Sequence, residues 1–241
     1  MKKMSRLLAL SFFLALMSLV MLGRPGQAAD ADEGQYYVFN QDGSLSTGGW
    51  VKSVDVYGDV SWYYANPDGT AFTGWKKISG EWYYFDPDSY YYGEMVTGSE
   101  EIDGKWYVFD QSGALSTGGW VKDSYGNWYY TNADGTPVTG WKTVEGKRYY
   151  FDFGPGVHHG EMVTGSKQID GTVFVFDQSG ALSTGGWVRN PDYPVDHWYY
   201  ANADGTAVTG WKTIGGKRYY FVDSDDSDYY GTMATGIVWI E

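Results

Sequence analysis

One short sequence recurs three times along this chain at nearly constant spacing. Residues 107–121 read YVFDQSGALSTGGWV, residues 174–188 read FVFDQSGALSTGGWV, and residues 37–51 read YVFNQDGSLSTGGWV. The offsets of 70 and 67 residues define three large repeats. Self-similarity at such a period indicates a repeat architecture, in which each copy is one small unit that buries its apolar face against its neighbours.

Each large repeat divides further into three units that share the pattern G-W, G-x-W-Y-Y-F, a turn and G-x-M-x-T-G. We therefore expect one nine-unit domain over residues 30–241. Its units lie near 35–48, 49–74, 75–98, 99–118, 119–140, 141–165, 166–185, 186–210 and 211–236, with a terminal stub at 237–241. No 50-residue segment remains for a separate catalytic domain, so we do not expect an enzyme.

The repeated aromatic run has the properties of a short β-strand. W-Y-Y-F combines residues with high strand preference, and Asp-Gly turn signals follow it at 66–69, 132–135 and 202–205. Because one two-stranded hairpin cannot bury its apolar face alone, we expect an all-β solenoid of stacked β-hairpins. The chain has 12 Trp, 23 Tyr and 11 Phe, so this core is built largely from rings.

Side chains of a strand alternate between its two faces, which divides the aromatic residues into two groups. We expect one face to form core, as with Tyr129, Thr131 and Tyr149. The other face, as with Trp128 and Tyr130, is the candidate surface. About half of the aromatic residues are expected to be only structural.

The N-terminal segment is typical of a secretory signal peptide. A basic start is followed by the apolar run 7–22 and by small residues up to Ala29. We expect residues 1–29 to be removed, with cleavage after Ala29 or Ala31; an uncleaved anchor is the alternative. No second long apolar run exists, so we expect no membrane contact after cleavage and a secreted or cell-surface location.

Charge and composition exclude several classes of partner. The formal net charge is −13, and removal of residues 1–29, which carry four basic residues and no acidic one, leaves −17. Nucleic acid is an unsuitable partner because phosphate binding requires clustered Lys and Arg. The chain has no Cys, so it has no disulfide or thiolate site.

No constellation in the sequence indicates catalysis or metal binding. The histidines are His158, His159 and His197, and we expect them to be solvated loop residues. The acidic run 223–228 lacks the glycine and distal Glu of a calcium loop. Most other Asp residues recur at turn positions, whereas a catalytic pair would occur once. We therefore expect no catalytic residue, no metal and no cofactor.

The unit G-W-x-K…G-x-W-Y-Y-F…G-x-M-x-T-G resembles the choline-binding or cell-wall-binding repeat family. It is similar also to the repeats of bacterial glucan-binding domains and large clostridial toxins. The resemblance implies a hairpin solenoid that attaches a secreted, non-catalytic protein to choline or phosphocholine of teichoic acids. The alternatives are a binder of glucan or another cell-surface polysaccharide, and a purely structural spacer. A homodimer is left open.

In choline-binding members, two Trp residues of one hairpin and a ring of the next form a cage around the ligand. The resemblance places such ligand-binding pairs at Trp50 with Trp62, Trp75 with Trp82, Trp120 with Trp128, and Trp187 with Trp198. It places the closing rings at Tyr84, Tyr150 and Tyr220 for the second, fifth and eighth units. The third unit is followed by Val108 at that position, which weakens its cage.

Departures from the pattern reduce the expected number of sites to about three. Arg148 and Arg218 replace the second Trp in the sixth and ninth units, and Ser99 and Ser166 replace the first Trp in the fourth and seventh. Electron-rich ring faces hold a quaternary ammonium, which has no N–H to donate. Three rings then give roughly millimolar affinity, which several sites on one polymer strengthen.

Overall fold

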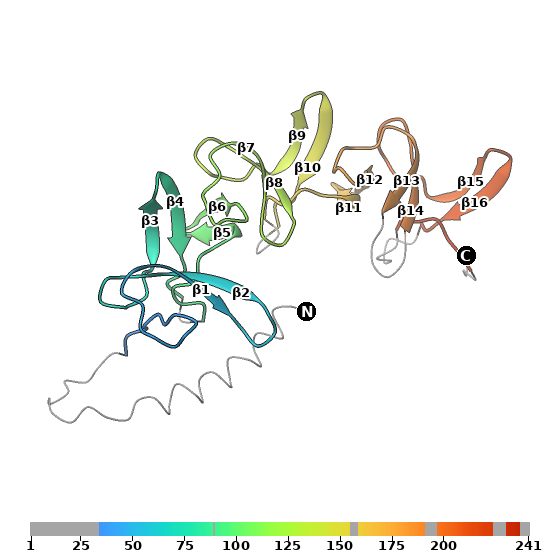
Figure 1. Cartoon of the computed structure of the whole chain (residues 1–241). Helices are drawn as coiled ribbons and strands as arrows, with labels where there is room; N and C mark the ends of the chain where they lie inside the picture. Colours follow the sequence, from blue (N-terminus) through green and yellow to red (C-terminus); the bar gives the residue numbers. More distant parts are fainter. Residues whose placement is uncertain (1–33, 89, 155–158, 191–196, 224–229, 237–241) are drawn as a thin grey trace, which may run out of the picture. The chain divides into compact units, whose positions relative to one another are not determined.

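The computed structural model describes residues 34–88, 90–154, 159–190, 197–223 and 230–236 (Figure 1). The expected signal peptide, both cleavage points and the terminal stub lie outside these residues. Contacts divide the chain into two compact units, residues 1–77 with 84–95 and residues 78–83 with 96–241. Each unit is described by itself.

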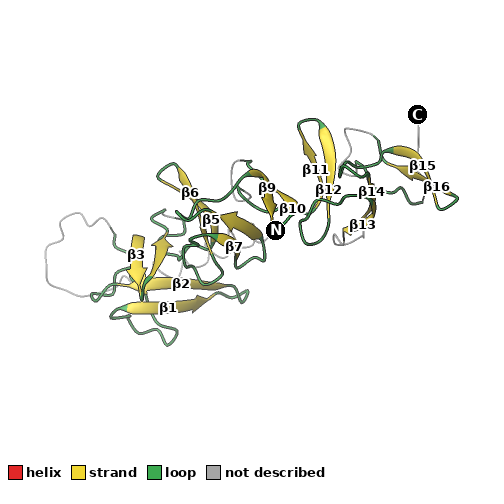
Figure 2. Cartoon of the chain, turned by 90° about the horizontal axis from the view of Figure 1, so that it is seen from above, coloured by secondary structure: helices red, strands yellow, loops and turns green. Residues whose placement is uncertain are grey.

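The described chain consists of β-strands and loops, without a helix (Figure 2). Its strands form eight two-stranded sheets, each made of two strands that follow one another in the sequence. The strands are β1 Gly49–Val54, β2 Val60–Ala65, β3 Gly74–Ile78, β4 Glu81–Phe85, β5 Gly98–Ile102, β6 Lys105–Phe109, β7 Gly119–Lys122, β8 Trp128–Thr131, β9 Gly140–Val144, β10 Lys147–Phe151, β11 Gly165–Ile169, β12 Thr172–Phe176, β13 Gly186–Asn190, β14 His197–Ala201, β15 Gly210–Ile214 and β16 Lys217–Phe221. The expectation of an all-β chain of repeated hairpins is confirmed. Among these residues, no helix reaches the length and hydropathy needed to cross a bilayer.

The first expected unit, residues 35–48, does not form a full hairpin. It makes only isolated bridges, between Phe39 and Leu45 and between Tyr37 and Thr70. The equivalent units in the second and third large repeats form β5–β6 and β11–β12. The strand that would correspond to β5 falls before residue 34, outside the described residues.

In five of the hairpins, a tight two-residue turn of one type joins the two strands. The two residues between β9 and β10 are Glu145 and Gly146, and both have positive φ, 50° and 78°. The same pair of positive φ angles occurs at 79–80, 103–104, 170–171 and 215–216. Positive φ at both positions defines the type I′ turn, whose twist matches that of the flanking strands.

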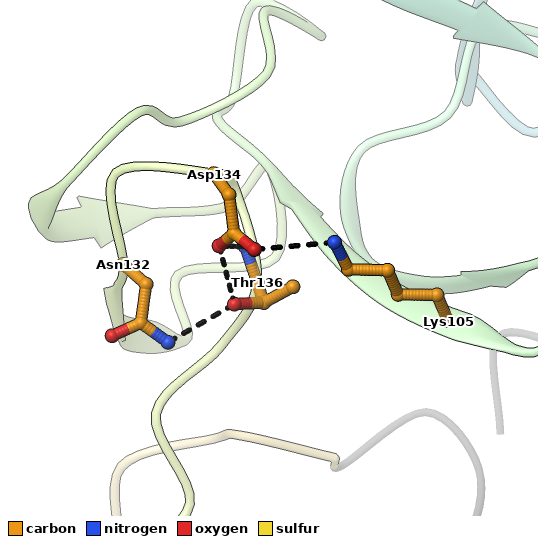
Figure 3. Close-up of polar contacts among 4 residues, drawn as sticks. All are labelled: Lys105, Asn132, Asp134 and Thr136. Carbon is orange, nitrogen blue, oxygen red and sulfur yellow. Dashed lines mark hydrogen bonds and ion pairs between the residues drawn. The ribbon is translucent and has the colours of Figure 1, made fainter.

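A different turn follows strands β2, β8 and β14, which end the hairpins of the second, fifth and eighth units. In residues 132–136, shown in Figure 3, Thr136 donates from its backbone N and from Oγ1 to Asp134 Oδ1, at 3.2 and 2.6 Å. Asn132 Nδ2 donates to Thr136 Oγ1 at 3.0 Å. Lys105 Nζ lies 3.1 Å from Asp134 Oδ2. The turns at 66–70 and 202–206 repeat the Asn, Asp and Thr bonds.

The last residue of the second strand in each pair forms the centre of the core. Five of these residues are Phe side chains with no exposed surface: Phe85, Phe109, Phe151, Phe176 and Phe221. The others are Ala65, Thr131 and Ala201, all buried. Each buried Phe forms a β-bridge with the Met or Leu of the segment that follows, as Phe151 does with Met162. The chain after a hairpin therefore folds back to cover that hairpin's strand end.

Alternation along β8 is as expected, whereas in β10 it fails because Tyr150 is buried as well as Tyr149 and Phe151. Tyr129, Thr131 and Tyr149 are buried, Trp128 is exposed, and Tyr130 is partly buried. Burial and the neighbouring Asp123 carboxylate raise the pKa of the Tyr129 hydroxyl above its usual range. Tyr129 Oη donates to Asp123 Oδ2 at 3.2 Å, so its polar end is satisfied inside the core.

Replacing Glu145 by Asn is expected to stabilise the protein by roughly 0.5–1 kcal/mol, because Asn tolerates positive φ better than Glu. Chemical denaturation followed by circular dichroism measures the free energy of unfolding. The control is Glu145→Gln, which removes the same charge and keeps the same backbone strain. Equal effects of the two variants would contradict this account of the turn.

Hydrogen bonds from Thr136 and the ion pair with Lys105 lower the pKa of Asp134 from 3.8 to about 2. This folded-state value lies below the unfolded one, so the carboxylate favours folding above about pH 4, and its contribution disappears as the pH falls toward 2. An NMR titration should show a larger upward shift of the Asp134 pKa in Thr136→Ala than in Lys105→Gln. A larger shift in the lysine variant would show that the ion pair dominates.

Candidate functional site

Four side chains share one face of the β7–β8 hairpin. In its antiparallel register Trp120 faces Tyr130 and Lys122 faces Trp128. Cross-strand partners project to the same face, and so do residues two apart on one strand. The Trp120 and Trp128 ring centroids lie 6.3 Å apart at an interplanar angle of 88°. The two indoles thus meet edge to face and form two walls at right angles.

The next hairpin supplies the floor of this arrangement. Tyr149 of β10 lies 4.8 Å from the Trp120 ring at 74°, and Phe151 lies at 5.8 Å. The chain after β10 then returns to the β7–β8 hairpin, where the Met162 backbone N donates to the Trp128 carbonyl at 2.7 Å. We call Trp120, Trp128, Tyr130, Tyr149 and Met162 the Trp120 cluster.

The third large repeat builds the same cluster with nearly identical geometry. The Trp187 and Trp198 centroids are 6.3 Å apart at 82°, and Tyr219 lies 5.0 Å from Trp187. The Met233 backbone N donates to the Trp198 carbonyl at 2.6 Å. We call this group, with Tyr200, the Trp187 cluster.

The first large repeat shows the corresponding arrangement within its own compact unit. Trp50 and Trp62 lie 6.3 Å apart at 88°, with Tyr64 and Phe85 each 5.5 Å from Trp50. The Met95 backbone N donates to the Trp62 carbonyl at 2.7 Å. We call these residues the Trp50 cluster.

The clusters are open to solvent on the indole side and closed beneath. Trp120 is 37% exposed and Trp128 41%, whereas Tyr149 is only 8% exposed. The indoles of the other two clusters are equally exposed, at 37–38%. Large apolar rings held half in water around a buried ring form a partly desolvated platform, suited to an organic cation or to the face of a sugar.

The closing rings expected from the sequence lie one residue away from those in the structure. Tyr150 pairs across its own hairpin with Trp141, at 5.2 Å, and it is Tyr149 that contacts Trp120. Likewise Tyr220 contacts Trp211 of its own hairpin at 5.2 Å, and Tyr219 contacts Trp187. Because successive strand residues face opposite sides, an error of one residue moves the ring to the other face.

The residues of the site expected at Trp75, Trp82 and Tyr84 make their described contacts within two different compact units. Tyr84 contacts Trp75 of its own hairpin at 5.2 Å. Trp82 is 43% exposed, and its carbonyl accepts a hydrogen bond from the Leu115 backbone N at 2.8 Å. Trp75 and Trp82 belong to different compact units and are therefore described separately. Val108 is fully buried in the core, and by the same one-residue shift the equivalent position is Tyr107, so the weakness expected from Val108 does not apply.

A cationic residue stands opposite the second Trp in all three clusters. Lys52 faces Trp62, Lys122 faces Trp128, and Arg189 faces Trp198 across the strand pair. Lys122 Nζ lies 5.6 Å from the Trp128 ring centroid. Each platform therefore has a hydrogen-bond donor and a positive charge beside it, which suits a phosphate or hydroxyl oxygen carried by the ligand.

The sequence reasoning missed Tyr149, Tyr219 and the three Met residues of the clusters. Strict alternation of W-Y-Y-F from the buried Phe backwards identifies the two tyrosines, since each lies two residues before Phe151 or Phe221. The recurrent G-x-M-x-T-G motif marks Met95 and Met162, and Met233 follows Gly231 in the same way. A polarizable thioether is well suited to packing against rings.

The two described histidines, His159 and His197, are less exposed to solvent than expected. The His159 ring stacks on Trp106, with centroids 4.5 Å apart and planes 17° from parallel, and it is partly buried. His197 lies at the start of β14 rather than in a loop. His158 lies outside the described residues. Nowhere in the described part of the chain do three or more His, Asp or Glu side chains gather as metal ligands.

Comparison with known proteins connects these clusters to a family. The family described as "Choline-binding repeat" matches residues 96–136, and the "Putative cell wall binding repeat" matches 73–88, 139–153, 196–207 and 209–225. The chain is also 35% identical over 177 residues to Glucosyltransferase-S of Streptococcus mutans serotype c, and 34% identical over 190 residues to Glucosyltransferase-I of Streptococcus downei.

These matches cover 73% and 78% of this chain but only 12% and 11% of the two glucosyltransferases. Among solved structures, choline binding protein F of Streptococcus pneumoniae is 30% identical, with 87% of this chain and 79% of that chain covered and a TM-score of 0.38. The family matches include the whole β7–β8 hairpin of the Trp120 cluster and Trp198 of the Trp187 cluster. The chain therefore belongs to the choline-binding and glucan-binding repeat family.

Proposed function

We propose that this protein is a secreted, non-catalytic module that attaches to choline-bearing teichoic acids of a bacterial cell wall. The observation that carries the proposal is the recurrence of one aromatic arrangement in all three large repeats. Each indole face is worth roughly 0.5–2 kcal/mol to a desolvated quaternary ammonium. Two indoles set over further aromatic rings thus suit a trimethylammonium group, which makes no directional hydrogen bond.

Repetition turns weak sites into firm attachment. One such site corresponds to roughly millimolar affinity, about −4.1 kcal/mol, for a free head group. A solenoid of stacked hairpins, delivered by a signal peptide to the outside of the cell, would present the Trp50, Trp120 and Trp187 clusters to a polymer with many head groups. Linking several weak contacts on one chain raises the overall affinity by orders of magnitude.

Glucan is the alternative ligand, supported by two observations. The chain is similar to parts of streptococcal glucosyltransferases, whose names indicate that they act on sugars. In addition, Lys52, Lys122 and Arg189 stand beside the indoles and provide the donors that sugar hydroxyls require. Trp75 and Trp82, each within its own compact unit, are further candidate residues for contact with either ligand.

A binding role without catalysis is supported by the way the recurrent carboxylates are used. Asp68, Asp134 and Asp204 each accept hydrogen bonds from the Thr two residues later and so hold turns. The pKa of each is lowered, first of all by the hydroxyl of that Thr. A carboxylate held ionised in a turn is unsuited to donate a proton as a general acid.

The ligand class is tested by titrating the protein with choline and with isomalto-oligosaccharides while Trp fluorescence is recorded. We expect saturation by choline, reduced by about one third in amplitude in Trp128→Ala, because one of three clusters is lost. The control, Tyr125→Ala, removes an exposed ring from the same hairpin outside the cluster and should leave binding unchanged. Saturation only by the sugars would select the glucan alternative, and no response to either would leave a structural spacer.

The identity of the closing ring gives an independent test of the site. Tyr149→Leu should abolish ligand binding at the Trp120 cluster, whereas Tyr150→Leu should preserve it, because Tyr150 faces Trp141 instead. Both tyrosines are buried, at 8% and 4% exposure, so thermal melting of the two variants provides a matched measure of their packing loss. A larger binding defect in Tyr150→Leu than in Tyr149→Leu would instead identify Tyr150 as the closing ring of the Trp120 cluster.

A further inference from the structure

The sixth unit contains a complete copy of the Trp120 cluster in which the second Trp is an arginine. Trp141 takes the place of Trp120, and Arg148 takes the place of Trp128. The Leu182 backbone N donates to the Arg148 carbonyl at 2.7 Å, which reproduces the bond from Met162 to Trp128. The backbone frame of the site is therefore intact.

The rings of this sixth-unit site are also in place. Trp141 is 5.2 Å from Tyr150 of its own hairpin and 5.0 Å from Phe174 of the next. Phe176 lies beneath at 5.7 Å. Phe174 occupies the position of Tyr149, and Phe176 that of Phe151. We call Trp141, Tyr150, Phe174, Phe176 and Leu182 the Trp141 cage.

The guanidinium of Arg148 lies over the Trp141 ring of this cage. Its Cζ lies 4.3 Å from the Trp141 ring centroid, well inside the distance of about 6 Å at which a cation and an indole attract. The chain carries 30 acidic residues, yet within the described residues no carboxylate forms an ion pair with Arg148. Attraction to the ring, rather than to a carboxylate, therefore positions this side chain.

We propose that Arg148 is an internal guest that fills the Trp141 cage and closes it to external organic cations. The ligand class is that of small quaternary ammonium groups, so the inference rests on the proposed function for its choice of guest. Because Arg148 is part of the chain, its guanidinium competes with a free ligand for the Trp141 cage at an effective concentration on the order of millimolar or above. A free head group that binds with roughly millimolar affinity cannot displace such a competitor efficiently.

The ninth unit provides a natural contrast. Arg218 Cζ lies 4.1 Å from the Trp211 centroid, so its guanidinium is stacked in the same way. Among the described residues, however, Trp211 has a ring contact with Tyr220 alone, and it is 53% exposed. Within the part of the chain that the structure describes, removing Arg218 leaves Trp211 with one neighbouring ring, whereas removing Arg148 leaves three rings around Trp141.

The experiment counts choline sites by isothermal titration calorimetry in the full chain. Arg148→Ala should gain one saturable site relative to the unsubstituted protein, and Arg148→Gln, which keeps the side-chain length without the charge, should gain it as well. Arg218→Ala should gain none. In Arg148→Ala combined with Trp141→Ala, the additional site should disappear.

An unchanged number of sites in both Arg148 variants, with unchanged thermal melting, would overturn the proposal. An equal gain in Arg218→Ala would also overturn it, because the effect would then be one of net charge rather than of a cage. Failure of the proposed function is distinguishable, since it appears as loss of choline binding by the unsubstituted chain. A new site in Arg148→Ala would still support the internal guest in that case.

Discussion

The whole structure depends on the inability of a two-stranded hairpin to bury its own apolar face. Each second strand ends on a residue that is completely covered, and the cover comes from the segment that leads to the next hairpin, as where Phe151 meets Met162. In the described hairpins, the covering of this strand end therefore depends on the segment that follows. The same dependence creates the clusters, because Tyr149 reaches Trp120 only when the following hairpin is in place.

The sequence was sufficient to predict repeated hairpins and the buried face of β8, because alternation is local and identifies Tyr129 and Thr131 as core. The turns were predicted after the aromatic strands, at 66–69, 132–135 and 202–205. Five hairpins instead reverse before the aromatic strand, as at Glu145 and Gly146. It was insufficient for the first unit, in which residues 35–48 make isolated bridges rather than a strand pair. The division into two compact units also depends on contacts that no single repeat encodes.

The indole pairs were predictable for the same local reason, since Trp120 and Trp128 belong to one hairpin. The closing ring was not, because it depends on how one hairpin meets the next. Tyr149 and Tyr150 are chemically identical neighbours, and only the packing between hairpins decides which of them faces Trp120. The G-x-M-x-T-G motif marks Met162, but the motif alone does not show that this residue bonds through its backbone N to the Trp128 carbonyl.

The exchange of Trp128 for Arg148 at equivalent positions leaves the surrounding frame unchanged, down to the backbone bond that follows it. Tryptophan and certain arginine codons differ by a single base. An open platform and one occupied by the chain's own guanidinium are therefore neighbours in mutational terms. A protein built from such repeats can change its number of open aromatic sites without gaining or losing a hairpin. Its affinity for the proposed polymer can therefore change by one unit at a time.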